Sequence, residues 1–290
     1  MIGRLQQDGF PTAALCEALE VQRSGYYAWL RGSQSRRARE DADFKALIRE
    51  IFWDHKRRYG ARRIAQELSA QGKSCGVGRV GRLLREMGLK AIQPKSFRPR
   101  TTDSRHRLGY SPNLLLTSAP PSGINQVWVG DISYIPLENS TFLYLAMLMD
   151  LYSRRIVSWE LRDHMKESLV LAALHSAIRF RRPGAGLIHH TDRGGQYAGN
   201  EYRRVLQRAG MRQSMNRADS CYDNAFTESC FGTIKTELEM ECYEREAVAR
   251  REIGQYIRYY NTRRRHSALG YLSPEQFEQL ASGGRAACKT

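Results

Sequence analysis

Three acidic residues of this 290-residue sequence, Asp131, Asp192 and Glu228, are candidates for catalysis. Asp131 lies within residues 125–135, a run rich in β-branched and aromatic side chains that predicts a strand. A carboxylate is costly to bury in such a strand unless it is paired. Asp192 follows a short apolar strand and begins a glycine-rich loop, and Glu228 lies near the start of an expected helix. Strand ends that open into such loops are where α/β sheets place their sites.

Taken singly, each acid has an ordinary structural explanation, as a turn residue, a helix cap or a solvated helical side chain. Taken together, the three would approach one another from two strands and a helix. Carboxylate oxygens suit Mg²⁺, and two such ions can activate a water or hydroxyl and stabilise the leaving oxygen in phosphoryl transfer. The set therefore predicts metal-dependent chemistry at a phosphate, with phosphate oxygens of the substrate completing the ligands.

The charge of the chain indicates the kind of substrate. The formal net charge is +16, and residues 1–110 carry 23 Lys and Arg against 11 Asp and Glu, a net charge of +12. A charge of this size and asymmetry suits a polyanion, so we expect a nucleic acid. The hydrophobic content of 41% and the charged content of 26% are typical of a globular protein and exclude a disordered one.

Cysteine usage and hydropathy exclude several other classes. The six cysteines form no Cys-x-x-Cys pair, and they complete no zinc-finger spacing with the seven histidines. No apolar run is long enough to span a membrane, and the N-terminus lacks a signal-peptide pattern. We therefore expect a cytoplasmic protein with reduced thiols and no membrane partner.

The N-terminal third predicts helices only. Residues 1–40 form a short helical segment with two candidate helices within residues 10–31, for which a first helix-turn-helix is one interpretation. Residues 41–92 predict three further helices, each with an apolar row at helical spacing, and Gly88 closes the last one. Three short helices with tight turns are typical of a helix-turn-helix domain, whose last helix enters the major groove of DNA.

Five arginines of this region are candidates for DNA contact. Arg79, Arg82 and Arg85 recur at every third residue of the last helix, away from its apolar row. Arg62 and Arg63 lie near the start of the middle helix. A solvated basic face is the alternative, but the clustering favours contact with DNA phosphates, which gives affinity without reading the base sequence.

The rest of the chain predicts a linker, a catalytic core and a tail. Residues 93–124 contain five prolines and many basic residues without periodicity, which indicates a linker before the core of residues 125–280 and the tail of residues 281–290. The strands expected in the core cover residues 127–135, 141–150, 155–161, 187–190 and 211–215. Three strands joined by short turns, followed by alternating helices and strands, predict an α/β fold with a mixed five-stranded sheet. We expect Asp150, at the end of the second strand, to cap a turn rather than act as a fourth acid.

The spacing of the three acids resembles the Asp-Asp-Glu (DDE) signature of retroviral-integrase-like transposases. Asp192 follows Asp131 by 61 positions, and Glu228 follows Asp192 by 36. Lys235, seven positions after Glu228, matches the basic residue that follows the glutamate in that family. Four strings and the helix-turn-helix of residues 44–90 look like the OrfB product of the insertion-sequence-three family. The strings are Trp-Val-Gly-Asp-Ile-Ser-Tyr, His-Thr-Asp-Arg-Gly-Gly-Gln-Tyr, Asp-Asn-Ala-Phe-Thr-Glu-Ser and Tyr-Asn-Thr-Arg-Arg-Arg-His-Ser-Ala-Leu-Gly-Tyr-Leu-Ser-Pro.

The resemblance implies the fold, the cofactor and the reaction. It implies a ribonuclease-H-like core, preceded by the all-α region, in which Asp131, Asp192 and Glu228 are both the catalytic and the metal-binding residues. The cofactor would be two Mg²⁺ or Mn²⁺ ions for each active site. The reaction would be hydrolysis at the 3′ ends of an insertion sequence, followed by attack of the freed 3′-hydroxyl on target DNA.

The resemblance also adds residues expected to contact DNA. These are Lys235, Arg193, Arg265 and His266. For His266, packing under the last turn of the preceding helix explains the residue equally well.

The expected partners are double-stranded DNA, as terminal repeats and target, and further protein. The family joins OrfA to OrfB by frameshifting, so we expect an OrfA product or an OrfA–OrfB fusion to act with this chain. Bringing two DNA ends together needs at least a dimer, so we expect a homo-oligomer on DNA, associated with the bacterial nucleoid. Two alternatives are a DNA-binding regulator with an inert core and another metal-dependent nuclease on the same fold. The three intact acids and Lys235 argue against the regulator.

Overall fold

The computed structural model describes residues 1–32, 35–93, 109–217, 225–239 and 242–286, with the backbone alone for residues 225–228 and 284–286. The chain divides into two compact units, Met1–Ala91 and Ile92–Thr290. Each unit has buried apolar residues of its own. Within the described residues, no helix combines the length and the apolar character needed to cross a membrane.

The first three helices of the N-terminal unit contact one another in sequence order. They are α1 (Ile2–Gln7), α2 (Thr12–Ala18) and α3 (Arg23–Leu30). Leu15 and Tyr26 are buried, and the Tyr26 hydroxyl donates to Oε1 of Gln6 over 2.6 Å. The connection between α2 and α3 turns at Glu20, which adopts a left-handed φ of 52°. The two helices expected within residues 10–31 are therefore present.

The next three helices form the larger core of this unit. They are α4 (Arg36–Asp54), α5 (Ala61–Ala70) and α6 (Val77–Glu86). The side chains with no exposed surface include Ile48, Ile64, Leu68, Val80 and Leu83. Gly88 follows α6 with a φ of 67°, which favours glycine, and the next N–H, of Leu89, donates back to the carbonyl of Leu84 over 2.9 Å. The predicted helices and the predicted glycine end are confirmed.

A five-stranded sheet organises the C-terminal unit. Its strands are β1 (Val127–Pro136), β2 (Phe142–Asp150), β3 (Ile156–Arg162), β4 (Ile188–Thr191) and β5 (Arg212–Met215). Their spatial order is β3-β2-β1-β4-β5. The first three strands pair antiparallel, whereas β1 with β4 and β4 with β5 pair parallel. The predicted mixed sheet is confirmed.

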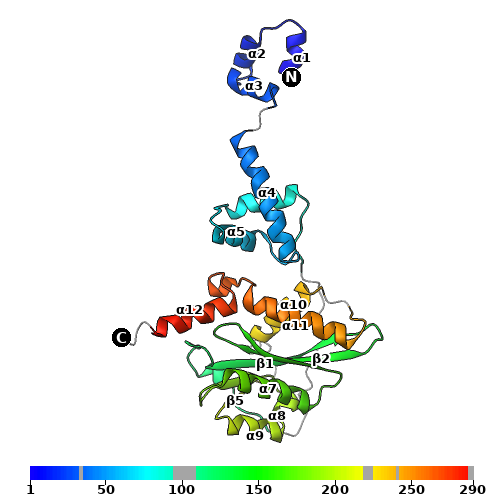
Figure 1. The fold of residues 1–290 in the computed structure, drawn as a ribbon, viewed down its shortest axis with the longest axis vertical. Helices are drawn as coiled ribbons and strands as arrows, with labels where there is room; N and C mark the ends of the chain where they lie inside the picture. Colours follow the sequence, from blue (N-terminus) through cyan, green and yellow to red (C-terminus); the bar gives the residue numbers. More distant parts are fainter. Residues whose placement is uncertain (33–34, 94–108, 218–224, 240–241, 287–290) are drawn as a thin grey trace. The chain divides into compact units, whose positions relative to one another are not determined.

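Helices cover both faces of the sheet (Figure 1). One face carries α10 (Ala225–Glu237) and α11 (Glu246–Thr262), and the other carries α7 (Glu167–Arg181), α8 (Gly195–Ala198) and α9 (Asn200–Arg208). In β1, Val127 and Val129 belong to the first core and Trp128 to the second. Because side chains alternate along a strand, Asp131 points to the face that α10 covers.

Part of the expected linker packs along the edge strand β5. Residues 109–116, which include the short helix η1 (Leu114–Leu116), contact β4 and β5. Ser111 Oγ donates to Oε1 of Gln213 over 2.8 Å, and the Leu114 N–H donates to Oγ of Ser214 over 2.9 Å. These residues therefore belong to the core rather than to a free linker, and they cover an edge that would otherwise present unpaired groups.

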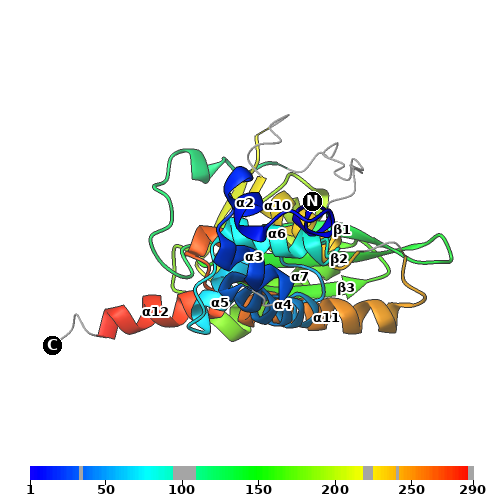
Figure 2. The same cartoon turned by 90° about the horizontal axis from the view of Figure 1, so that it is seen from above.

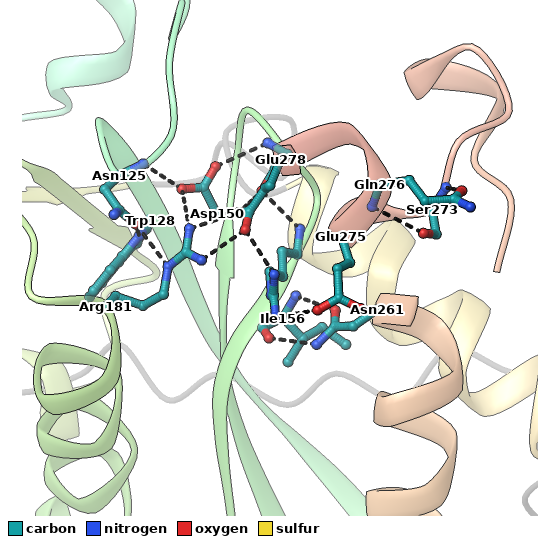
Figure 3. A network of polar contacts seen from close by, with 12 residues as sticks. Asn125, Trp128, Asp150, Ile156, Arg181, Asn261, Ser273, Glu275, Gln276 and Glu278 are labelled. Carbon is teal, nitrogen blue, oxygen red and sulfur yellow. Dashed lines mark hydrogen bonds and ion pairs between the residues drawn. The ribbon is translucent and has the colours of Figure 1, made fainter. Parts of the chain in front are cut away.

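A helix that the sequence did not predict, α12 (Pro274–Ala286), is held to the core by Glu278. Arg181 of α7 donates to both carboxylate oxygens of Glu278 at 2.9 and 2.7 Å (Figure 3). Arg155 and Ser153, in the turn between β2 and β3, donate to the same carboxylate at 2.9 and 2.7 Å. The helix extends beyond the sheet in both views and includes residues 281–286, where we expected a tail (Figures 1 and 2).

Asp150 caps the turn after β2, as expected. Its Oδ1 accepts the N–H groups of Tyr152 and Ser153, each over 3.0 Å, and its Oδ2 accepts the N–H of Asn125 over 2.7 Å (Figure 3). Burial raises the pKa of Asp150, and the backbone hydrogen bonds from Ser153 and Asn125 oppose that shift. The carboxylate thus has a structural role in the turn.

Gly199, between α8 and α9, makes room for a carboxylate that caps α9. Oε1 of Glu167 accepts the Tyr202 N–H over 3.0 Å, and a Cβ at Gly199 would overlap that oxygen. We expect Gly199→Ala to lower the free energy of unfolding by about 1–3 kcal/mol, the usual cost of overpacking. Urea denaturation measures this, with Gly184→Ala as the control because no atom lies within 4 Å of a Cβ there. If both variants are equally stable, Gly199 is not needed to make room for the Glu167 carboxylate.

Candidate active site

The sheet brings Asp131 and Asp192 side by side. β1 and β4 are parallel neighbours, and their last paired residues are Gly130 and Thr191. Each aspartate is the next residue along its chain, and both are half-buried. In a parallel pair, residues at matching positions project to the same face from strands about 4.8 Å apart. The backbones of the two aspartates are therefore close together.

Gly130 and Gly194, near the two aspartates in the sequence, have little room for a side chain because other side chains pack against them. A Cβ at Gly130 would lie 3.0 Å from Cε1 of His189, a fully buried side chain whose Nε2 is 2.7 Å from the Tyr202 hydroxyl. A Cβ at Gly194 would lie 3.1 Å from Oδ1 of Asp192. That same oxygen accepts the Gly194 N–H over 3.0 Å. The packing is thus tight beside both acids, and the Gly194 N–H holds the carboxylate of Asp192.

The charges of both aspartates act on one buried phenol. Tyr197 lies in α8, directly after the Asp192 loop. Burial raises the pKa of Tyr197 well above its ordinary value, and the neighbouring Tyr202 hydroxyl adds to the shift. The charges of Asp131 and Asp192 raise the pKa of Tyr197 further. The two carboxylates thus place negative charge at this end of strands β1 and β4, where it would attract a cation.

α10 carries the predicted lysine and the predicted third acid. The helix packs against β1, and Lys235 is half-buried. Burial lowers the pKa of Lys235, and the nearby charge of Asp131 opposes that shift. Glu228 lies seven residues earlier, about two helical turns, and so on a similar side of α10. The lysine is therefore close enough to the first aspartate for their charges to interact.

The side chain of Glu228 lies outside the described residues, as do Asp223 and Asn224, which precede α10. Among the side chains that the structure describes, no three His, Cys, Asp or Glu residues converge as a metal site. The structure thus places two of the three predicted acids together. The contribution of Glu228 stays a prediction.

A buried ion pair, not expected from the sequence, fixes the C-terminal end of α10. Glu237 ends that helix, and Arg264 follows α11. Their side chains are 7% and 6% exposed. Nε of Arg264 lies 3.0 and 2.9 Å from the two carboxylate oxygens, and Nη2 lies 2.7 Å from Oε1. The Tyr256 hydroxyl donates to Oε2 over 3.0 Å. Burial opposes charge on Arg264, but the hydrogen bonds from Arg264 to Glu237 hold the pKa of the guanidinium above its ordinary value.

The sequence held a signal for this pair. Glu237 follows the fully buried Ile234 by three positions, so it falls on the buried side of α10. An acid on an apolar row needs a partner. Arg264, however, lies in an Arg-Arg-Arg-His run, which is typical of residues that bind DNA. We therefore did not predict that Arg264 pairs with Glu237.

His266 and Arg265, both predicted to contact DNA, make contacts within the core. His266 is 9% exposed, and its ring lies edge-on to Tyr260 with the ring centroids 4.7 Å apart. Nη1 of Arg264 lies 3.4 Å from either ring nitrogen. Nη1 of Arg265 donates to the carbonyl of Tyr271 over 3.0 Å. The position of His266 favours the packing explanation over contact with DNA.

Arg193, the residue after Asp192, is held across the end of the sheet. Its Nε donates to the carbonyl of Asn216 over 2.6 Å, and the Asn216 N–H donates to the carbonyl of Thr191 over 3.0 Å. His190 is fully buried, with Nε2 2.7 Å from Oδ1 of Asn216. Arg193 thus places a cation next to Asp192, and its contact with DNA stays a prediction.

In the N-terminal unit, two of the five arginines predicted to contact DNA pair with an acid of α4. Nε of Arg79 and Nη2 of Arg82 lie 2.7 Å from Oδ1 and Oδ2 of Asp41, respectively. Their hydrogen bonds lower the pKa of Asp41. These two guanidinium groups help to hold α6 against α4, which leaves them less available to phosphate.

The other three arginines differ in exposure. Arg63 is half-buried, with Cζ 5.5 Å from the centroid of the Tyr59 ring, whereas Arg62 and Arg85 are exposed. Arg62 and Arg85 are therefore the better placed of the five to meet DNA.

Known proteins resemble this chain in both units. The model of an Integrase core domain matches residues 121–221, a second Integrase core domain model matches residues 209–274, and an HTH-like domain matches residues 38–97. The "Insertion element IS600 uncharacterized 31 kDa protein" of Shigella sonnei is 40% identical, over 92% of this chain and 100% of that protein. "Transposase InsF for insertion sequence IS3A" of Escherichia coli (strain K12) is 39% identical, over 94% of this chain and 95% of that protein. The HTLV-2 integrase catalytic core domain, in complex with magnesium, matches 55% of this chain and 99% of its own at 15% identity, with a TM-score of 0.45.

Proposed function

Because this chain belongs to the IS3 family of insertion-sequence transposases, we propose that it cleaves the 3′ ends of its element and joins them to target DNA. It is an enzyme with an integrase core and an HTH-like domain. The observation that supports this chemistry best is that Asp131 and Asp192 directly follow Gly130 and Thr191, the last paired residues of two parallel neighbouring strands.

We infer that Asp131, Asp192 and Glu228 hold two Mg²⁺ or Mn²⁺ ions. The donor set fits these hard cations, because it is made of carboxylate oxygens and two of them are adjacent. The charges of both aspartates contribute to the raised pKa of Tyr197, after burial and Tyr202, so both lie near this one side chain. When bound, the metal would promote ionisation of the attacking water or hydroxyl and stabilise the leaving oxygen.

The chain's own residues bind and shape the substrate around this site. Tyr197 is 2% exposed and packs in the core with α7 and α9, so it supports the loop of Asp192 from within. Burial raises its pKa, and the phenol is neutral. Lys235 places a positive charge near Asp131, and Arg193 directly follows Asp192, so both would pair with phosphates that flank the scissile bond. In the N-terminal unit, Arg62 and Arg85 would contact phosphates of the terminal repeat.

Transposition requires more than one chain. We propose that this chain acts as a homo-oligomer that holds two DNA ends, with the OrfA product or as part of an OrfA–OrfB fusion. Its place of action would be the nucleoid, in the bacterial cytoplasm. The DNA partners are the terminal repeats of the element and a target duplex.

A strand-transfer assay tests the proposed function. Labelled element-end duplexes and a supercoiled target are incubated with the chain and Mg²⁺, with and without the OrfA product. We expect joined products, because the freed 3′-hydroxyl attacks the target. Cleavage without joining would identify a nuclease, and binding without cleavage would identify a regulator, so either result would reject the proposal.

A further inference from the structure

An exposed tyrosine stands beside the candidate active site. Tyr110 keeps 41% of its surface exposed, although it belongs to the segment that covers β5. The guanidinium of Arg193 lies over its ring, with Cζ 4.6 Å from the ring centroid. Because Arg193 directly follows Asp192, Tyr110 is in contact with the residue next to a predicted metal-binding acid.

The backbone on the C-terminal side of Tyr110 is well held. Ser111 Oγ donates to Oε1 of Gln213 over 2.8 Å, and the carbonyl of Pro112 accepts the N–H of Met215 over 3.4 Å. The residue before Tyr110, Gly109, accepts a hydrogen bond at its carbonyl from Arg203. Because the backbone on both sides of Tyr110 is already ordered, this residue would lose little conformational freedom when a ligand binds.

The position of Tyr110 suits DNA that runs across the end of the sheet. The strands from the site outwards are β1, β4 and β5, and Ser111, the residue after Tyr110, donates a hydrogen bond to Gln213 of β5. At about 4.8 Å for each strand, Tyr110 lies about 10–15 Å from Asp131. Successive nucleotides of one DNA strand rise by about 3.4 Å. The ring is therefore about three or four nucleotides from a phosphate that reacts at Asp131 and Asp192.

We propose that Tyr110 and Arg193 form a nucleotide-binding position, in which a base near the scissile phosphate stacks on Tyr110 and an adjacent phosphate pairs with Arg193. The proposal rests on the proposed function, because it takes the DNA to be centred on the two aspartates. Base stacking on an aromatic ring tolerates any base, and an arginine over the ring adds positive charge. A ring that only covered the edge strand would be buried against it, whereas Tyr110 is 41% exposed.

Fluorescence of 2-aminopurine, which falls when this base stacks on an aromatic ring, tests the proposal. The probes are element-end duplexes with 2-aminopurine at each of the six nucleotides nearest the cleaved end, bound to the full chain in a metal chelator. We expect quenching centred on the third or fourth position with the wild type and with Tyr110→Phe, which keeps the ring. Tyr110→Ala should lose the quenching and bind the duplex roughly tenfold more weakly.

Phe180→Ala is the matched control. Phe180 is 73% exposed and also lies beside an arginine, Arg179, with Cζ 6.0 Å from the ring centroid. It is at the C-terminal end of α7, which leads into the start of β4, whereas Asp192 follows the end of β4. Phe180→Ala should therefore quench like the wild type, and thermal unfolding of each variant verifies that it is folded.

Two outcomes overturn the proposal. One is quenching by Tyr110→Ala equal to that of the wild type at every position, and the other is loss of quenching in Tyr110→Phe. Neither depends on catalysis, because the chelator prevents it. Joining by the wild type, together with unchanged quenching in Tyr110→Ala, would reject this binding position and leave the proposed function standing. If quenching depends on the ring but the chain never joins DNA, the binding position stands and the proposed function is rejected.

Discussion

Asp131→Asn will abolish cleavage and joining of element ends and leave the binding of those ends nearly unchanged. Asparagine keeps the shape of the side chain and the oxygen that accepts the Ile132 N–H over 2.8 Å. It removes the negative charge that a metal ligand needs. We expect strand transfer to fall by a factor on the order of 10³ or more, the scale seen when one member of a catalytic unit is lost. Asp192→Asn should behave in the same way, because Asp131 and Asp192 directly follow the paired residues Gly130 and Thr191.

Asp163→Asn is the control for this change. It removes the same charge from an exposed position after β3. Strand transfer and electrophoretic mobility shift are measured for each variant. Joining by Asp131→Asn above a few per cent of the wild type would contradict the metal-binding role, and so would equal losses in the Asp163 control.

Arg264→Met will lower the free energy of unfolding by about 3–5 kcal/mol, the cost of leaving one partner of a buried ion pair without the other. Methionine has a similar length and can fill part of the space, but Glu237 then keeps its charge at 7% exposure without the guanidinium, and the Tyr256 hydroxyl still donates to it. Urea denaturation measures the change. Arg204→Met is the control, because the pair of Arg204 with Glu201 is largely exposed and should contribute at most about 1 kcal/mol.

A double variant separates charge from packing in this prediction. Glu237→Leu combined with Arg264→Met removes both charges, so it should recover a large part of the lost stability. If the double variant is no more stable than Arg264→Met, packing of the guanidinium, and not the unpaired carboxylate, accounts for the loss. The pair matters for the site because Glu237 ends the helix that carries Lys235 and the backbone of Glu228.

The sequence predicted the parts of the fold that follow from local patterns. A run of β-branched and aromatic side chains predicted β1, and the glycine at position 88 predicted the end of α6. The segment of residues 109–116 was missed, because its residues show no period and its order comes from bonds to Gln213 and Ser214, about 100 positions away. α12 was missed for a similar reason. Its place depends on Glu278, which meets an arginine of α7 97 positions earlier.

The candidate site was predictable to the same extent. Asp131 and Asp192 were identified by residue type and spacing, and the parallel register then brought them together. The arginines of α6 show the limit of such patterns. Arg79 and Arg85 look alike in the sequence, but Asp41, 38 positions before Arg79, pairs with Arg79 and leaves Arg85 exposed. Charge patterns locate a basic region, whereas tertiary pairing decides which of its side chains meet solvent.

The number of Mn²⁺ ions bound to each chain on cleaved element-end DNA tests the three-acid, two-metal site most directly. Equilibrium dialysis with electron paramagnetic resonance counts the bound ions for the wild type and for Glu228→Gln. The account predicts two ions for each active site in the wild type and the loss or marked weakening of at least one in Glu228→Gln, because that change removes a charged ligand. Binding of both ions to Glu228→Gln as tightly as to the wild type would contradict it.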